Sequence, residues 1–317
     1  MIFLFEYSTC TGDVPDSIAV EGLAMFKTLF DGFSKITEVN SFVNQDFRDL
    51  FSLPVSDNWS EDFKEHIEGS DYFLLIAPED ENLLFELTRY AEMRAENLGS
   101  SSRGVLFASD KWLTYLKLKN KVNMPETSLR PLDKPYIVKP RLSCGGEGIT
   151  IGNPDSRLPD GFIAQEFVDG KDLSISLLAG DEIRVLSINS QILKNFRYCG
   201  AEIPFDCEEV LEEAIKAVES IKGLYGYVGV DVVLAEVPYV IEVNPRLTTP
   251  SIAFREVYGM EIAEMIIRNY QGKKIPEFKP RKTVTLKKVR GYSPDSVFYC
   301  RGNSIVIANR KELNTNA

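Results

Sequence analysis

One stretch of this chain, residues 229–246, decides both its fold class and its chemistry, and it reads GVDVVLAEVPYVIEVNPR. The pattern predicts two apolar strands joined by a short turn. Glu242 and Asn244 are two residues apart on the second strand, so both side chains point to the same face. Asp231 is on the first strand, and a hairpin can place it beside them. The sequence therefore predicts three oxygen-bearing side chains on one face of a rigid sheet.

These three side chains suit a divalent cation. Carboxylate and amide oxygens are hard ligands, the kind that Mg²⁺ prefers when it also bridges nucleotide phosphates. The apolar neighbours are expected to point inward, and they are Val230, Val232, Ile241 and Val243. A hairpin with a polar outer face is the structural alternative, but Glu-x-Asn-Pro-Arg at a strand end is much more specific than polar alternation.

A second segment, residues 138–149, predicts a strand that ends at Lys139 and enters a glycine loop. Glycine lets backbone N–H groups approach phosphate oxygens without a side-chain clash, and the lysine adds a positive charge. The segment lacks the Walker A and G-x-G-x-x-G spacings. Taken alone, it is equally compatible with an ordinary glycine hairpin.

A third segment, Gln-Glu-Phe-Val-Asp-Gly-Lys-Asp at residues 165–172, is an apolar strand that runs into a polar turn. Such a strand can offer backbone groups to an adenine edge and a carboxylate to ribose hydroxyls. By itself it is as compatible with a structural role as with a functional one.

Composition narrows the classes of function. The chain has 317 residues, 44% of them apolar, and a formal net charge of −11. This acidic balance argues against a nucleic-acid binder, whose affinity comes mostly from phosphate neutralisation. The single histidine, His66, is in a polar stretch typical of a helix surface, which argues against histidine-based triads. Five cysteines without a C-x-x-C pair indicate reduced thiols rather than zinc.

No apolar run approaches the ~18 residues of a membrane span, and the N-terminal run is too short for a signal peptide. A cytosolic protein is therefore expected.

Strands and helices alternate over residues 1–108, which predicts a small open α/β sheet. The pattern includes a long helix over 81–98 and a loop at 99–104. Asp110 is a predicted N-cap for a helix that starts at Lys111. At roughly 150 residues per domain, the chain should hold about two domains or three lobes.

The three segments, together and in this order, resemble the ATP-grasp superfamily over about residues 109–272. The resemblance implies an α/β fold with an N-terminal Rossmann-like pre-ATP-grasp domain and a two-lobed ATP-grasp module. The implied ranges are a pre-ATP-grasp domain at 1–108, a small lobe with the phosphate loop at 109–178, and a large lobe with the metal site at 179–317.

The resemblance also implies a role for each matching residue. ATP and one or two Mg²⁺ ions, which Mn²⁺ can replace, are the implied cofactors. The nucleotide would be held by Lys111, Lys139, Ser143, Gly145, Gly146, Gly148, Gln165, Glu166, Phe167, Val168 and Asp172. The metal ligands would be Asp231, Glu242 and Asn244, and the catalytic residues Lys139, Arg197 and Arg246, with Arg246 stabilising the transferred phosphoryl group.

Within the superfamily, the chain is similar to the archaeal ligases that join L-glutamate to tyramine in methanofuran biosynthesis. The shared features are the opening Ile-Phe-Leu-Phe-Glu-Tyr with Thr11-Gly12, the stretch 189–191, and Arg197-Tyr198 through Pro204. This resemblance implies ATP-driven amide formation at the γ-carboxylate, with small-molecule partners and a possible homodimer. An ATP-grasp ligase for another amino acid or peptide, and a non-catalytic ATP-binding regulatory protein, stay as alternatives.

Overall fold

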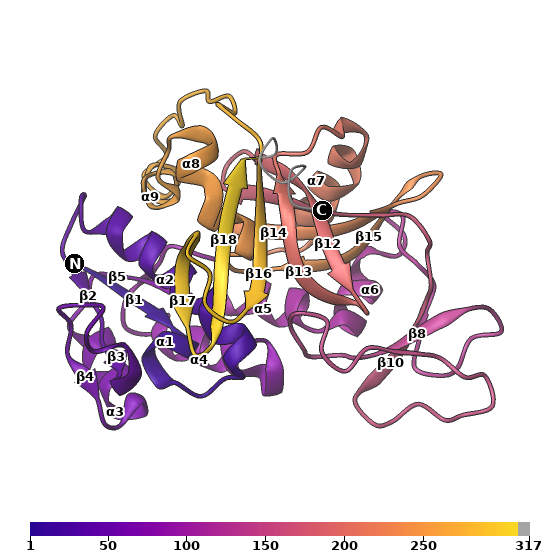
Figure 1. Cartoon of the computed structure of the whole chain (residues 1–317). Coiled ribbons are helices and arrows are strands. Elements are labelled where there is room, and N and C mark those ends of the chain that lie inside the picture. Colours follow the sequence, from indigo (N-terminus) through magenta and orange to yellow (C-terminus); the bar gives the residue numbers. More distant parts are fainter. Residues whose placement is uncertain (310–317) are drawn as a thin grey trace.

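The N-terminal part of the chain is built on a parallel sheet whose two central strands are largely apolar because both faces are covered. The computed structural model describes residues 1–309 of the chain, and Figure 1 shows this part at the indigo end. The sheet has the order β2-β1-β5-β6, and β1 is fully buried. Its strands are β1 (Ile2–Glu6), β2 (Val39–Asn40), β5 (Tyr72–Ile76) and β6 (Glu96–Asn97), and a separate parallel pair is formed by β3 (Val43–Asn44) and β4 (Val55–Ser56).

Helices cover this sheet. The longest, α2, packs on β1 and also against α9, β17 and β18, so it lies between the N-terminal sheet and the end of the chain. The elements are α1 (Tyr7–Thr11), α2 (Asp16–Phe33), η1 (Gln45–Phe47), α3 (Trp59–Glu68), η2 (Asp80–Asn82), α4 (Leu83–Ala91) and α5 (Ser102–Ser109).

Three expectations for this part need correction. The helix expected over 81–98 is shorter, because α4 ends at Ala91 and the chain then adds strand β6 to the sheet. The loop expected at 99–104 already contains the start of α5, where the Ser101 side chain caps the helix by accepting from Gly104 N–H. His66 is half-buried rather than on the surface, and its ring stacks on Phe3.

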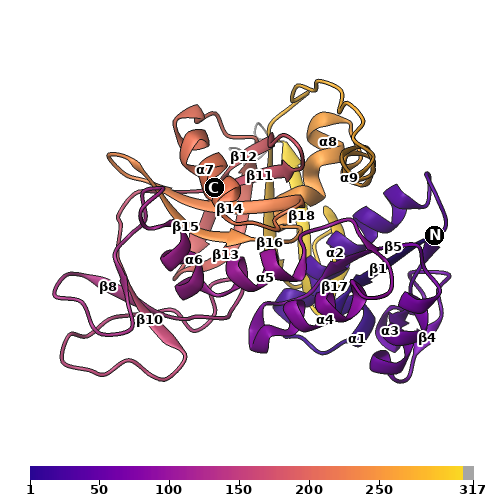
Figure 2. The same cartoon turned by 180° about the vertical axis from the view of Figure 1, so that it is seen from behind.

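A small antiparallel sheet follows, with the order β7-β10-β8-β9, and it projects away from the N-terminal part in both views (Figures 1 and 2). Its elements are α6 (Lys111–Leu118), β7 (Thr127–Ser128), β8 (Tyr136–Pro140), β9 (Thr150–Ile151) and β10 (Phe162–Glu166).

The strands between residues 171 and 309 form an eight-stranded antiparallel sheet, ordered β15-β14-β11-β12-β13-β16-β18-β17. Its strands are β11 (Lys171–Ala179), β12 (Arg184–Lys194), β13 (Arg197–Ile203), β14 (Gly226–Leu234), β15 (Pro238–Asn244), β16 (Val284–Arg290), β17 (Ser296–Cys300) and β18 (Asn303–Asn309). Its helices are η3 (Glu208–Val210), α7 (Leu211–Ser220), η4 (Thr249–Ala253), α8 (Phe254–Tyr258) and α9 (Ile262–Tyr270).

Helices α5, α6 and α7 pack on β15, and Figure 2 shows them on that side of the large sheet. The segment after residue 272 completes this sheet, since β16 pairs with β13. The boundary between the two lobes was expected at residue 178, which lies near the end of β11. The chain passes from the small sheet to the large sheet earlier, between Glu166 and Lys171.

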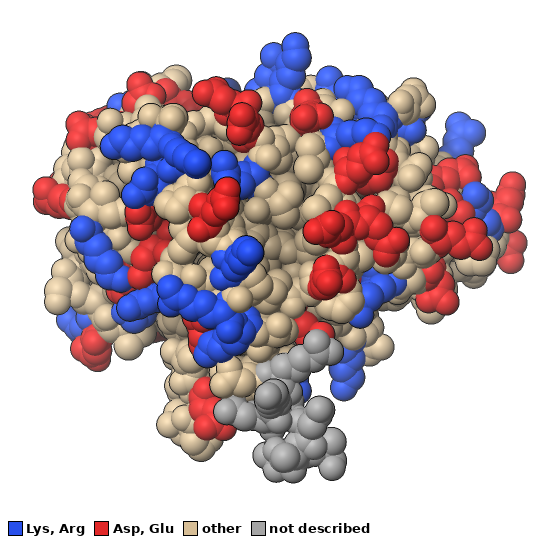
Figure 3. Space-filling model, turned by 90° about the horizontal axis from the view of Figure 1, so that it is seen from above, with Lys and Arg blue, Asp and Glu red and all other residues tan. Residues whose placement is uncertain are grey.

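The charged side chains of both signs are mixed on the surface. Lys and Arg side chains are interspersed with Asp and Glu on the face shown in Figure 3. Within residues 1–309, no helix is both long and apolar enough to cross a bilayer.

Candidate active site

A cleft of about 410 Å³ runs between the small sheet, the large sheet and helix α2. Most of the residues predicted to bind nucleotide or metal, or to act in catalysis, contribute to its wall, although they come from six strands and three loops. Those in the wall are Lys139, Gly145, Gly146, Gln165, Glu166, Phe167, Val168, Asp172, Arg197, Asp231, Glu242, Asn244 and Arg246, whereas Lys111, Ser143 and Gly148 are not.

The predicted metal ligands lie together on the hairpin β14–β15. Asp231 is directly opposite Glu242 in the strand register. Asn244 donates an amide N–H to Asp231 Oδ2 at 3.1 Å, and Gln191 of β12 donates to Asp231 Oδ1 at 2.8 Å. The sequence argument did not identify Gln191 as a partner of this carboxylate.

One detail of this hairpin differs from the prediction. A β-bulge after Asp231 shifts the register, so that Val232 faces Val240 rather than Ile241. Val240 is therefore fully buried in the core, and Ile241 lies in the cleft wall instead of pointing inward.

Burial perturbs the charges in this cleft. Desolvation, with a further contribution from Glu242, raises the pKa of Asp231 to about 7. Desolvation also lowers the pKa of Lys139 to about 8, opposed by the attraction of Glu242. Both shifts show charged groups that are held away from water with incomplete compensation, which is typical of sites that bind a charged ligand.

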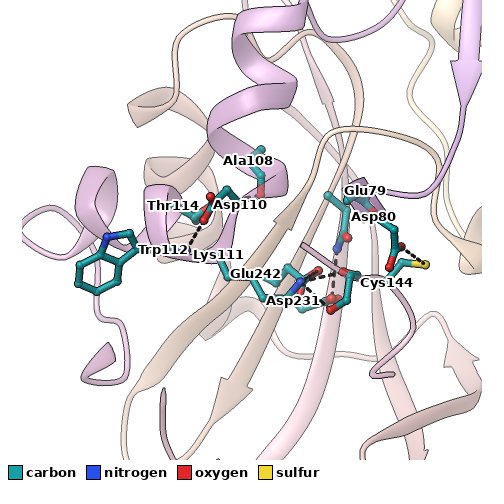
Figure 4. Close-up of polar contacts among 12 residues, drawn as sticks. Glu79, Asp80, Ala108, Asp110, Lys111, Trp112, Thr114, Cys144, Asp231 and Glu242 are labelled. Carbon is teal, nitrogen blue, oxygen red and sulfur yellow. Dashed lines mark hydrogen bonds and ion pairs between the residues drawn. The ribbon is translucent and has the colours of Figure 1, made fainter. Parts of the chain in front are cut away.

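Lys111 follows the capping residue of its helix and lies near the predicted metal ligands. Asp110 accepts from the N–H groups of Trp112 and Leu113, and it also pairs with Arg141 at the end of β8. Lys111 Nζ donates to the Ser143 carbonyl at 2.8 Å and lies 3.5 Å from Glu242 Oε1. Figure 4 shows the lysine reaching from α6 toward Glu242 and Asp231. It therefore lies behind the cleft wall, where it pairs with a predicted metal ligand.

The glycine loop is held against the large sheet. Gly145, Gly146 and Gly148 all have positive φ angles, a conformation that favours glycine. A Cβ on Gly146 would overlap the carbonyl of Phe196, at the turn between β12 and β13. The loop therefore approaches the opposite wall so closely that only glycine fits there.

The predicted adenine hinge has part of its backbone already engaged. The N–H of Glu166 donates to the Glu126 carbonyl, and the N–H of Phe167 donates to the Pro135 carbonyl. The Glu166 carboxylate pairs with Lys134 at 3.2 Å. Further along the cleft, burial and the nearby Asp169 raise the pKa of Asp172, the predicted ribose ligand.

The two predicted arginines differ in environment. Arg246 is tied by two hydrogen bonds, at 2.8 and 3.0 Å, to both carboxylate oxygens of Glu79, which is 2% exposed. Arg197 is exposed at the rim of the cleft. The sequence argument missed Glu79, although its position just after a buried parallel strand is a common place for functional residues.

Two further residues of the cleft wall, Glu21 of α2 and Lys288 of β16, were not predicted, because no local motif marks them. Tyr198 of β13, which belongs to the shared segment 197–204, lines the same cleft. Of the shared features at 189–191, Asn189 is fully buried in the core, where it donates to the Ser174 carbonyl.

The donor set is compatible with a magnesium site. Within the described range, no group of three or more His, Cys, Asp or Glu side chains could hold a metal ion. A site here would therefore depend on two carboxylates and the Asn244 amide oxygen, with other ligands from nucleotide phosphates and water, as Mg²⁺ commonly has.

Comparison with known proteins identifies the family of this chain. The ATP-grasp domain family matches residues 108–250, and the pre ATP-grasp 3 domain family matches residues 39–105. A tyramine–L-glutamate ligase from Methanocaldococcus fervens is 36% identical over 307 residues, which cover 91% of this chain and 100% of the relative. The chain belongs to the ATP-grasp family. The predicted α/β fold class and the resemblance are thus confirmed.

Two further ATP-grasp relatives are similar over most of their length. The tyramine–L-glutamate ligase of Methanocaldococcus jannaschii is 37% identical over 289 residues, covering 85% of this chain and 89% of the relative. The crystal structure of an ATP-grasp superfamily protein from Archaeoglobus fulgidus is 45% identical, with a TM-score of 0.87 over 97% of this chain and 98% of that chain. This ATP-grasp chain is accordingly a ligase. It uses ATP to join the carboxylate of one small molecule to the amine of another.

Proposed function

We propose that the chain joins the γ-carboxylate of L-glutamate to the amine of tyramine, with γ-glutamyltyramine, ADP and phosphate as products. The observation that carries this proposal is the likeness to two tyramine–L-glutamate ligases, at 36% and 37% identity over most of each chain. The arrangement of the cleft is compatible with it.

The nucleotide would lie along the wall made by the small sheet. Lys139 and the glycine loop would hold its phosphates, with Ser143 and Gly148 shaping the loop. The hinge would contact adenine through the Glu166 carbonyl and the Val168 N–H, because the N–H groups of Glu166 and Phe167 are already used. Gln165 and Asp172 would bound the base and the ribose.

A magnesium ion bound by Asp231, Glu242 and Asn244 would neutralise phosphate charge and orient the γ-phosphoryl group. The other residues act by positioning. Gln191 fixes one oxygen of Asp231, and Lys111 pairs with Glu242, so both carboxylates are oriented before a ligand arrives.

The reaction would proceed in two displacements. A γ-carboxylate oxygen of glutamate attacks the γ-phosphorus of ATP, and ADP leaves with the electrons of the broken P–O bond. The neutral amine of tyramine then attacks the acyl carbon, phosphate leaves, and the amine loses a proton. Both steps depend on positioning and charge neutralisation more than on a covalent group of the protein.

The basic side chains near the phosphates would stabilise the transferred group. Lys139 lies in the cleft wall, and Arg246 lies there with its charge oriented by Glu79. Arg197, on the rim, would attract the incoming anionic substrate. The contact between Gly146 and Phe196 would close the site over the acyl phosphate, which hydrolyses in water.

The test is ADP release by purified protein with Mg-ATP, L-glutamate and tyramine, together with mass spectrometry of the product. Tyramine-dependent ADP release with formation of the amide would support the proposal. Release with another acid and amine from a panel would retain the ligase and refute these substrates. Measurable ATP binding without turnover on any pair would favour a regulatory ATP-binding protein.

A further inference from the structure

An ion pair between helix α2 and strand β16 forms part of the cleft wall. Glu21 of α2 bonds Lys288 of β16, and its second oxygen accepts from the Thr249 hydroxyl. The two charged side chains are only 13% and 19% exposed, and both contribute to the cleft wall. The charges are therefore largely desolvated, yet they face the space in which a substrate would bind.

An unpaired hydroxyl lies beside this pair. The Tyr198 hydroxyl is buried and has no hydrogen-bond partner within residues 1–309, although its residue lines the cleft. Burial, with the charges of Glu21 and Asp231, raises its pKa, so the hydroxyl lies within the influence of both carboxylates. A buried hydroxyl without a partner is costly, which indicates that a ligand completes its bonding.

We propose that Glu21 and Lys288 bind the α-ammonium and α-carboxylate groups of an amino-acid substrate, and that the Tyr198 hydroxyl bonds the same substrate. This inference rests on the proposed function, because it assigns the glutamate end that does not react. The side-chain carboxylate would then extend toward Asp231 and the metal ligands.

Charge balance favours a zwitterion over other ligands. A zwitterion gives each member of the ion pair a new partner of opposite charge, so neither charge is left unpaired in a desolvated place. A simple amine would face Lys288, and a dicarboxylate would face Glu21, each with a like charge.

The positions of Glu21 and Lys288 in the sequence support a role in substrate specificity. They are separated by 267 positions in the sequence, and both lie outside residues 108–250, which match the ATP-grasp domain family. The shared domain supplies the nucleotide site, whereas this pair comes from flanking segments that are free to differ between ligases.

The test compares three acids with tyramine as the amine: L-glutamate, glutarate without the α-amino group, and 4-aminobutyrate without the α-carboxylate. Glu21→Gln should raise KM for glutamate about 10- to 100-fold and should not raise KM for glutarate, which loses a repulsive like charge. Lys288→Met should raise KM for glutamate similarly and should not raise KM for 4-aminobutyrate, for the same reason. Neither variant should change KM for ATP.

Two controls separate recognition from damage to the fold. Lys287→Met removes the neighbouring lysine, which is exposed, and should match wild type in all assays. The double variant Glu21→Gln/Lys288→Met leaves no buried charge unpaired and should still bind glutamate poorly. Equal rises in KM for all three acids, or a rise for tyramine alone, would overturn the inference.

If the proposed substrates are wrong, the outcome can be told apart from a failure of the zwitterion-binding inference. If wild-type protein releases no ADP with glutamate and any amine, the proposed function fails. The same variants are then assayed with the amino acid found in the panel and with its deamino and decarboxy analogues. Selective effects of Glu21→Gln and Lys288→Met on those analogues would still support zwitterion binding, and their absence would refute it.

Discussion

At the scale of single residues, the cleft is notable for charges that are buried without full compensation. Asp231 and Lys139 both have pKa values shifted toward their neutral forms by burial. Such groups cost stability in the unliganded protein, and a ligand of opposite charge recovers that cost. The gain in ligand binding explains why a protein keeps such destabilising charges in a binding cleft.

Replacement of Glu242 tests the metal assignment. Glu242→Ala should lower kcat by at least about 100-fold, because one of two carboxylate ligands is lost. Circular dichroism and the unfolding midpoint should stay close to wild type, since the hairpin core is made by Val230, Val240 and Val243. Glu236→Ala, in the exposed turn of the same hairpin, is the matched control. Near-normal turnover by Glu242→Ala would contradict the assignment of Glu242 as a metal ligand.

The charge of Lys139 predicts how ATP binding depends on pH. Its pKa in the folded protein is about 8, below the ordinary value of 10.5, so half of the ammonium groups have lost their proton at pH 8. ATP affinity measured by calorimetry should therefore be close to full below about pH 7 and weaken progressively up to about pH 10. A Kd that does not change over this interval would contradict a phosphate-binding role.

The charge of Lys139 should favour ATP binding but lower the stability of the unliganded protein. Because the folded state lowers the pKa of Lys139, burial of its charge destabilises the unliganded protein fully below pH 8, and this penalty fades as pH rises toward 10.5. Lys139→Met should consequently raise the unfolding midpoint at pH 7 while it weakens ATP binding about 10- to 100-fold. A lower midpoint together with unchanged ATP affinity would show that Lys139 is purely structural.

At the scale of elements, the glycine loop depends on one close approach. Gly145 and Gly146 both have positive φ, but a Cβ would meet the Phe196 backbone only at Gly146, and nothing at Gly145. Side chains at these two positions therefore carry the same backbone strain and differ only in the contact between the loop and the β12–β13 turn.

This difference yields a matched pair of variants. Gly146→Ala should lower kcat/KM about 10- to 100-fold more than Gly145→Ala, because the loop can no longer close against the turn. ADP release without amide product, from a hydrolysed acyl phosphate, should also rise in Gly146→Ala. Equal effects of the two substitutions would attribute the loss to backbone strain rather than to closure.

At the scale of the whole molecule, Glu79 and Arg246 join the N-terminal part of the chain to the hairpin β14–β15. The pair is bidentate and nearly buried, so loss of the carboxylate leaves an uncompensated guanidinium. Glu79→Gln should lower the free energy of unfolding by about 3–5 kcal/mol, measured by urea denaturation. It should also weaken turnover, since Arg246 loses its orientation.

The control uses an exposed ion pair. Glu86→Gln breaks the surface pair with Arg89, whose side chain is 63% exposed, and should change the free energy of unfolding by less than about 1 kcal/mol. A similarly small change for Glu79→Gln would mean that the two parts of the molecule are not coupled through this pair.

The sequence by itself determined the features that depend on neighbouring residues. The hairpin at 229–246, the glycine loop after Lys139 and the Asp110 cap were all readable, because strand alternation, positive φ and helix capping follow from local backbone geometry. These features were enough to predict the fold class, and most of the site residues that they predicted lie in the cleft wall.

Only the tertiary structure decided what depends on the path of the whole chain. It pairs Glu21 with Lys288 and Arg246 with Glu79, and its bulge after Asp231 puts Ile241 rather than Val240 in the cleft. No local pattern encodes these contacts, since each joins segments whose separation in space is set by how the two sheets and α2 pack together. The wall proposed to bind the nucleotide was therefore predictable from motifs, whereas the part of the wall proposed to select the substrate was not.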